Sequence, residues 1–194
     1  MATTKSIKGT KTEINLANAY VAESTAYTRY TFYAQQANKE QYYQISNIFN
    51  ETADNELHHA KIFLKYLEES AVAPATTIDN GILGSTLNNL RTAASEEETE
   101  GVDLYKKAAD VADEEGFPEI AEQFRAIASI EEHHRRRFLE LADQVEKGTV
   151  WKREKPIKWQ CLVCGYIFEG TTPPEVCPAC KHPYQHYEAL GELF

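Results

Sequence analysis

Residues 49–67 read FNETADNELHHAKIFLKYL, a segment whose apolar residues recur at intervals of three and four. This periodicity predicts an amphipathic helix with one face in a core. A carboxylate, Glu56, interrupts the apolar stripe at its centre, and His59 follows one turn later. Because residues three apart share a helix face, both polar side chains are expected to point into the core.

Three other segments repeat this pattern of carboxylates within an apolar stripe. In one of them, Glu131 and His134 form a second Glu-x-x-His pair. Glu97 and Glu100 interrupt the stripe of another segment, and apolar residues flank Glu23 in the last. The spacing also indicates an internal repeat, because Glu23 lies 33 residues before the first Glu-x-x-His pair and Glu97 lies 34 residues before the second.

Four long helices account for these segments. Thr10 and Glu13 have the spacing of a capping box before the first helix. The connection at residues 71–85 contains Pro74 and the turn sequence Asp-Asn-Gly at 79–81, and it is long enough to cross a bundle. Two short links and one long crossover predict a mainly α, ferritin-like four-helix bundle. The helices are expected at residues 12–38, 40–70, 86–115 and 118–148.

The buried carboxylates point to bound cations. Burying one unpaired carboxylate costs several kcal/mol, so several in one core require positive charge beside them. A single Glu-x-x-His on a helix is most often a solvated charge pair, but two copies in register, each centred on an apolar stripe, favour a metal site. Five carboxylates and two imidazoles can bind two metal ions, as in di-iron carboxylate bundles. The predicted ligands are Glu23, Glu56, His59, Glu97, Glu100, Glu131 and His134.

Composition excludes several classes of protein. The 194 residues are 42% hydrophobic, which is enough for a packed core and rules out general disorder. The formal charge of −10 does not attract nucleic acid or anionic membranes. No apolar run approaches the roughly 18 residues of a membrane span, and the polar N-terminus lacks the apolar region of a secretory signal. We therefore expect a cytoplasmic protein that binds neither nucleic acid nor membrane.

The cysteines form a second motif near the C-terminus, where two C-x-x-C pairs are separated by twelve residues. One such pair can be a redox dithiol, whereas two together favour a single tetrahedral metal ion, either iron or zinc. The segment after residue 151 is neutral, so the helical part carries the net charge. This change predicts a bundle domain at residues 1–150 and a small domain at residues 151–194. The cysteines are Cys161, Cys164, Cys177 and Cys180.

Together these motifs closely resemble the rubrerythrin family over nearly the whole chain. Rubrerythrins join a ferritin-like di-iron bundle to a rubredoxin-like Fe(Cys)4 domain, so the resemblance implies a helical bundle followed by a small β domain. Glu100 is the distinctive residue, because the corresponding position after Glu23 is Ala26. In rubrerythrins, the residues matching Glu100 and His59 exchange as ligands to one iron when the redox state changes.

The resemblance implies a peroxidase in oxidative-stress defence. It implies two iron ions in the bundle, with an oxo or hydroxo bridge, that give two electrons to hydrogen peroxide and yield water. One iron ion in the four-cysteine site, for which zinc could substitute, would re-reduce the pair, with electrons from NAD(P)H through a separate reductase or a rubredoxin. The expected catalytic residues are Glu100, His59 and Tyr30. Tyr30 is an aromatic core residue by default, but it lies seven residues after Glu23 on the same face and could hydrogen-bond into the site.

The last bundle helix bears on electron transfer. From His134 to Gly148 is 14 residues, or roughly 21 Å of helix at about 1.5 Å per residue. Transfer within one chain would be long, so we expect a head-to-tail homodimer in which one subunit's cysteine domain approaches the other's di-iron site, as the resemblance also implies. Two other classes stay open: a ferroxidase or iron-handling protein of the ferritin kind, and a zinc-stabilised binding module.

Overall fold

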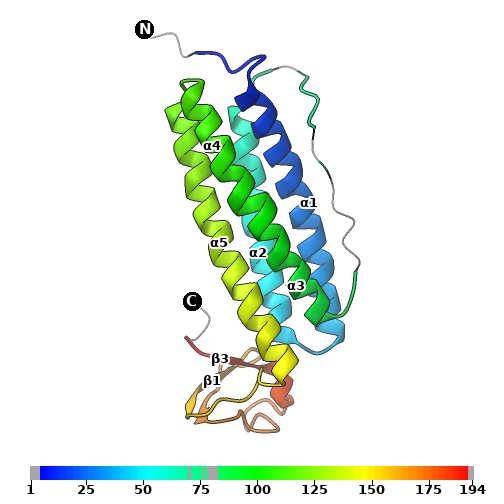
Figure 1. The fold of residues 1–194 in the computed structure, drawn as a ribbon. Coiled ribbons are helices and arrows are strands. Elements are labelled where there is room, and N and C mark those ends of the chain that lie inside the picture. The colour runs from blue at the N-terminus through cyan, green and yellow to red at the C-terminus, as the bar shows by residue number, and fades with distance from the viewer. Residues whose placement is uncertain (1–4, 70, 76, 78–82, 192–194) are drawn as a thin grey trace. The chain divides into compact units, whose positions relative to one another are not determined.

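The computed structural model describes residues 5–69, 71–75, 77 and 83–191, except for the side chain of residue 100. It confirms the predicted fold class, a four-helix bundle followed by a small antiparallel sheet (Figure 1). The first two helices are α1 (Lys11–Lys39) and α2 (Tyr43–Tyr66), and the last is α5 (Pro118–Lys147). The third consists of α3 (Thr86–Glu96), the π-helical segment η1 (Glu97–Leu104) and α4 (Tyr105–Glu114).

The ends of the helices differ slightly from the prediction. Helix α2 begins at Tyr43 and not at residue 40, because the chain turns through Gln41, whose φ of 67° lies in the left-handed region. The amide of Tyr42 donates to the carbonyl of Ala37 across this turn. The predicted turn at residues 79–81 lies outside the described residues.

The predicted capping box at the start of α1 is half confirmed. The amide of Glu13 donates to Thr10 Oγ1 at 3.1 Å, but the Glu13 carboxylate accepts from the amide of Gly9 at 2.7 Å and not from that of Thr10. A distant residue completes the cap, since the carboxylate of Glu115 accepts from the amides at the first two positions of α1, at 3.1 and 2.8 Å. The carboxylates satisfy amides that the helix itself leaves unpaired.

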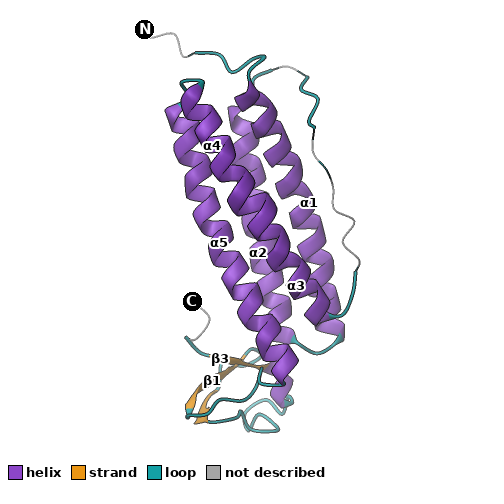
Figure 2. Cartoon of the chain, in the orientation of Figure 1, coloured by secondary structure: helices purple, strands orange, loops and turns teal. Residues whose placement is uncertain are grey.

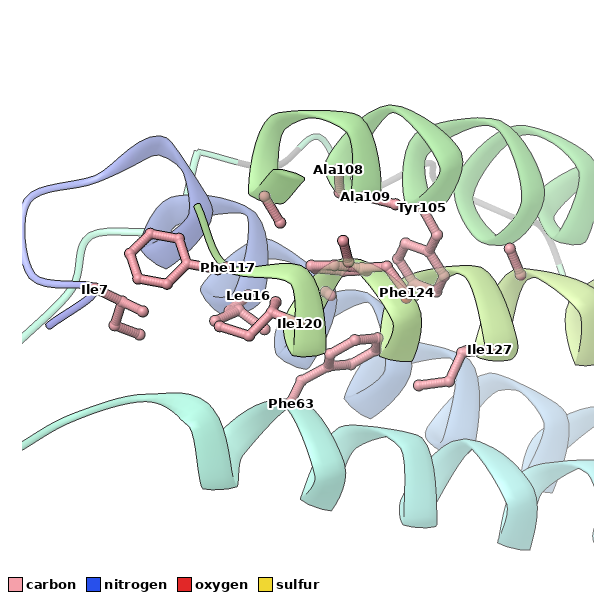
Figure 3. Packing of buried hydrophobic residues seen from close by; sticks show 14 residues of the cluster. Ile7, Leu16, Phe63, Tyr105, Ala108, Ala109, Phe117, Ile120, Phe124 and Ile127 are labelled. Carbon is pink, nitrogen blue, oxygen red and sulfur yellow. The ribbon is translucent and has the colours of Figure 1, made fainter. Parts of the chain in front are cut away.

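Two compact units divide the described chain. The first contains residues 1–29, 52–81 and 95–135, and the second contains residues 30–51, 82–94 and 136–194. In the first unit, aromatic and alanine side chains pack into one apolar cluster (Figure 3). The rings of Phe63, Tyr105 and Phe124 contact one another there, with centroids 5.0–5.7 Å apart. The second unit has its own aromatic cluster and also contains the cysteines.

Strands occur, among the described residues, only after residue 156 (Figure 2). They are β1 (Ile157–Cys161), β2 (Ile167–Gly170) and β3 (Tyr187–Ala189), paired antiparallel in the order β2-β1-β3. A short 3₁₀ turn, η2 (Tyr184–His186), precedes β3. The predicted boundary between residues 150 and 151 stays a prediction, because the two compact units cut across the long helices.

A membrane span was not expected from the sequence. Within the part of the chain that the structure describes, no helix combines the length and the apolar character needed to cross a bilayer.

Candidate metal centres

Six of the seven predicted bundle ligands come together in the first compact unit. Their ligand atoms form two groups, and within each group the atoms lie within 4.8 Å of one another. Glu56 from α2 and Glu131 from α5 belong to both groups. None of the six residues is more than 5% exposed. One group is Glu23, Glu56, His59 and Glu131, and the other is Glu56, Glu97, Glu131 and His134.

The two groups have matching geometry around their imidazoles. His59 Nδ1 lies 2.9 Å from Glu56 Oε2 and 3.0 Å from Glu131 Oε1. His134 Nδ1 lies 3.1 Å from the other oxygen of Glu56 and 2.8 Å from the other oxygen of Glu131. Each imidazole also has one carboxylate of its own at 3.8 Å, Glu23 for His59 and Glu97 for His134. The internal repeat of the sequence therefore corresponds to an approximate twofold symmetry in the arrangement of the site residues.

The orientation of these side chains fits bound metal ions. Glu56 Oε1, both Glu131 oxygens and His134 Nδ1 are fully buried and close together, yet among the described residues they have no partner with hydrogen-bond geometry. Polar atoms that converge without pairing leave a position for a shared cation. Carboxylate oxygens and imidazole nitrogens are ligands that iron accepts. The Glu/His groups therefore suit a di-iron site.

Electrostatics shows how the cluster balances charge without a cation. Burial opposes charge on His59, but the neighbouring carboxylates of Glu131, Glu23 and Glu56 outweigh it and raise the pKa of His59 to about 12. Burial likewise opposes charge on Glu56, but the neighbouring imidazoles of His134 and His59 lower its pKa to about 2. Burial raises the pKa of Glu23 well above the usual value. Protonated imidazoles thus supply the positive charge that a metal ion would otherwise supply among the carboxylates.

Tyr105 is a site residue that sequence reasoning did not single out. Its hydroxyl donates to Glu23 Oε1 at 2.5 Å, and its ring packs between the rings of Phe63 and Phe124 (Figure 3). The apolar packing holds the hydroxyl against a buried carboxylate. No local signal could reveal this contact, because 82 residues separate the partners.

The π-helical segment η1 was also not expected, and Gly101 explains how it fits. A Cβ atom at residue 101 would lie 2.6 Å from both Cβ and Cγ of Glu131, closer than real contacts allow. It would also lie 3.3 Å from Glu97 Oε2. Glycine therefore permits η1 to approach α5 at a shared carboxylate. An isolated glycine in a helical pattern is the signal that could have indicated this close approach, and π-helical turns are frequent at functional sites.

Two predicted catalytic residues are not part of these groups. Tyr30 is 1% exposed, and its ring contacts Tyr33, Phe49 and Phe138 in the second compact unit, with centroids 5.4–6.1 Å away. Its hydrogen bond to the metal site stays a prediction. Glu100 lies on η1, but its side chain is outside the described part of the structure.

The four cysteines form a separate cluster at the end of β1, in the turn between β1 and β2, and in the loop that follows β2. All four sulfurs lie within 4.8 Å of one another, and the cysteines are free thiols. The Cys161–Cys180 and Cys164–Cys177 sulfurs are each 3.7 Å apart. Metal–sulfur bonds of about 2.3 Å place tetrahedral sulfurs about 3.8 Å apart. The cluster therefore has the dimensions of a site with one metal ion and four thiolates.

Comparison with known proteins agrees with this arrangement. The rubrerythrin family model matches residues 15–81 and 88–161, and the model of the rubrerythrin rubredoxin-like domain matches residues 159–188. Rubrerythrin of Porphyromonas gingivalis is 48% identical over 186 residues, covering 96% of this chain and 93% of that protein. Rubrerythrin-1 of Clostridium acetobutylicum is 47% identical over 194 residues, covering 98% of this chain and 100% of that protein.

Solved structures of nigerythrin have a similar fold. A mixed-valence state matches with a TM-score of 0.62 and 28% identity, over 97% of this chain and 90% of that one. A fully reduced, all-ferrous state matches with a TM-score of 0.60, also at 28% identity, over 97% and 91% of the two chains. The Glu/His groups and the four cysteines match the iron cofactors of rubrerythrins. With both family models matched in order along the chain and close relatives matched over nearly its full length, this chain belongs to the rubrerythrin family.

Proposed function

We propose that this chain is a non-haem di-iron peroxidase that reduces hydrogen peroxide to water with electrons passed through its Fe(Cys)4 site. Membership of the rubrerythrin family supports the coarser role of an iron-containing oxidoreductase in oxidative stress that exchanges electrons with a redox partner. One observation supports the finer proposal above all. Two buried Glu/His groups share Glu56 and Glu131, in a chain that also contains the four-cysteine cluster.

Glu23 and His59 would hold one iron ion, Glu97 and His134 would hold the other, and Glu56 and Glu131 belong to both groups. Glu100 would be the ligand that exchanges with His59, and Tyr30 would donate a hydrogen bond into the site. Bound iron would supply the electrons that break the O–O bond. Reduction of one hydrogen peroxide molecule consumes two electrons and two protons and yields two molecules of water.

The chain's own residues hold this site in place and keep water out. Tyr105 donates to Glu23 Oε1, so the other oxygen, Oε2, faces His59 at 3.8 Å. The rings of Phe63 and Phe124 fix Tyr105 in turn. Low exposure of the polar groups strengthens every electrostatic interaction among them. In this proposal, a small oxidant reaches a dry site with ligands already oriented.

Electron supply requires partners beyond the single chain. We propose an NAD(P)H-linked reductase or a rubredoxin as donor and a head-to-tail homodimer as the working assembly. Helix α5 extends from the site to Lys147, and a continuous helix adds about 1.5 Å per residue. The dimer would bring the cysteine domain of one subunit to the di-iron site of the other.

Anaerobic rapid mixing tests the peroxidase. Iron-loaded, fully reduced protein is mixed with hydrogen peroxide while the visible band of oxidised Fe(Cys)4 is followed. We expect this band to return much faster with peroxide than with dioxygen. The variant His59→Ala should lose the fast phase. The matched control is His58→Ala. His58 is next to His59 on the same helix, but it is exposed, and its Nδ1 contacts the carbonyl oxygen of Asp54.

Other outcomes identify other functions. A band that does not respond to peroxide would overturn the peroxidase and favour a ferritin-like ferroxidase. Iron-replete expression that yields a colourless protein would indicate zinc at the cysteines and a structural module. Full turnover by a strictly monomeric variant would overturn the head-to-tail dimer while leaving the peroxidase intact.

A further inference from the structure

The π-helical segment η1 has a side-chain contact with α1 at each of its ends. Glu96, the residue directly before η1, forms an ion pair with Nη1 of Arg29 on α1. Tyr105, the residue directly after η1, donates its hydroxyl hydrogen to Glu23 Oε1 on the same helix at 2.5 Å. The two contacts therefore attach both ends of η1 to one neighbouring helix.

The Arg29–Glu96 pair is largely buried, although both partners are charged. The two side chains are only 13% and 10% exposed, and Glu96 Oε1 itself is shielded from water. Charged side chains are rarely buried unless they are paired. Within the described part of the chain this oxygen has no partner with hydrogen-bond geometry, so its contact with the guanidinium is one of charge.

We expect η1 to depend on contacts from outside the segment. π-Helical turns are rare and mostly occur as single turns within α-helices, whereas η1 covers eight residues. On the side of α5, Gly101 permits the backbone to approach Glu131 closely, but the absence of a side chain supplies no attraction. On the side of α1, the ion pair of Arg29 with Glu96 supplies an attraction at the start of the segment.

The candidate ligand Glu97 directly follows Glu96 in the chain. Its carboxylate is buried, and its Oε1 lies 3.8 Å from His134 Nδ1 on α5. Because adjacent residues share a rigid peptide plane, the contact that fixes Glu96 also limits where the Glu97 side chain can point. One carboxylate is thus held by α1, and the next one reaches the Glu/His group.

We propose that Arg29 is a positioning residue for the candidate di-iron site, because its ion pair with Glu96 holds the start of η1 on α1 and keeps Glu97 beside His134. Arg29 itself belongs to neither ligand group. This inference rests on the proposed metal site and deepens it. Residues that hold a metal ligand in place commonly affect metal affinity strongly, although they never touch the metal.

The first test measures η1 in the full-length, metal-free protein. The variant Arg29→Met removes the positive charge and keeps an unbranched side chain of similar length. Hydrogen exchange of the backbone amides, followed by mass spectrometry, reports local opening. We expect the amides of η1 to lose protection in this variant, while those of α2 keep the protection that they have in the unmodified protein.

The second test measures binding of the metal. Ferrous iron is titrated anaerobically against a competing chelator, with the cysteine iron measured separately by its visible band. We expect the affinity of the bundle for iron to fall about 10–100-fold in Arg29→Met. Arg29→Lys should restore most of this affinity, because lysine keeps the charge on which the contact depends. A residue that only filled space would not distinguish methionine from lysine.

Two further variants complete the design. Arg29→Met leaves a buried carboxylate unpaired, so Glu96→Gln tests the same contact even if the first variant does not fold. Its expected losses in protection and affinity are the same. Glu98→Gln is the matched control on η1. The Glu98 side chain is 56% exposed and pairs with Arg135 at 3.3 Å, and surface ion pairs contribute little, so both readouts should be unchanged.

Full protection of η1, or unchanged iron affinity, in both Arg29→Met and Glu96→Gln would overturn the inference. Equally weak binding by Arg29→Met and Arg29→Lys would also overturn it. Its failure is distinguishable from failure of the proposed function, because neither readout uses peroxide. A chain with the expected losses but no response to peroxide would keep Arg29 as a positioning residue and lose the peroxidase. If the unmodified chain binds no iron in the bundle, both are wrong.

Discussion

The imidazole rings of His59 and His134 lie 6.3 Å apart with an angle of 23° between their planes. Each Nδ1 contacts a different oxygen of the same two carboxylates, Glu56 and Glu131. The two halves of the repeat therefore build one site and not two independent ones. Because the carboxylates are shared, a substitution at one of them should weaken the binding of both proposed metal ions.

Removal of a shared carboxylate should lower the number of metal ions bound in the bundle more than removal of an unshared one. We expect Glu131→Ala to lose both bundle irons, because Glu131 belongs to both ligand groups. Glu23→Ala should retain the iron beside His134, whose group does not include Glu23. Metal analysis of the purified variants, with the cysteine iron measured separately by its visible band, gives the count. Glu132→Ala is the control, and a Glu131→Ala protein with both irons would contradict the shared arrangement.

Gly101→Ala tests the close approach of η1 to α5. Alanine would normally stabilise a helix by about 0.8–1 kcal/mol relative to glycine. Here its methyl group meets Glu131 at 2.6 Å, so the carboxylate must move. We expect metal affinity of the bundle to fall by about 10–100-fold, the usual effect of disturbing the support of a ligand. Competitive metal titration measures this change.

Thr99→Ala, an exposed position on the same π-helical segment, controls for helix propensity in that experiment. Its metal affinity should match that of the unmodified protein. If Gly101→Ala also binds metal normally, the absence of a side chain at 101 has no role in the site.

Tyr105→Phe should destabilise the metal-free protein. The substitution leaves Glu23 Oε1 buried without the hydroxyl that donates to it at 2.5 Å. The expected loss in free energy of unfolding is about 1–3 kcal/mol, measured by urea denaturation. Tyr20→Phe is the matched control, because Tyr20 packs partly buried against the same apolar cluster. Equal losses in the two variants would mean that the bond to Glu23 contributes nothing.

The stability of the metal-free and iron-loaded proteins should respond oppositely to pH. The carboxylates of Glu131 and Glu56 beside its imidazole outweigh burial and raise the pKa of His134 from 6.5 to about 9. The pKa of His59 is raised in the same direction, to about 12. A raised pKa gives stabilisation that is complete below the unfolded value and lost as pH rises through the folded value. The metal-free protein should therefore lose stability from about pH 6.5 to pH 9 and above.

Iron binding needs neutral imidazoles, so metal binding releases protons and strengthens as pH rises. Urea denaturation of chelator-treated and iron-loaded protein over this pH range compares the two slopes. His134→Gln should flatten the slope of the metal-free protein. A metal-free protein whose stability rises from pH 6.5 to 9 would contradict the assigned protonation of the imidazoles.

Local spacing was enough to predict most of the fold and to single out the six Glu and His residues that the structure brings together. The Glu-x-x-His pairs place two ligands on one helix face whatever lies opposite, and apolar periodicity marked that face as buried. The π-helical segment η1 was missed because its sequence, EETEGVDL, contains too few apolar residues for their spacing to distinguish an α-helical from a π-helical turn. The start of α2 was missed because Gln41, and not a glycine, adopts the left-handed turn.

Residue identity and short-range spacing alone therefore settled the four helices, the two Glu-x-x-His pairs and the pairs of cysteines. These features depend on backbone geometry over three or four residues, which is the same wherever the helix packs. The tertiary structure decided that Glu131 is shared, that Gly101 lies against it, and that Tyr105 aims its hydroxyl at Glu23. Those contacts depend on how closely distant elements approach, and packing of whole side-chain surfaces sets that distance.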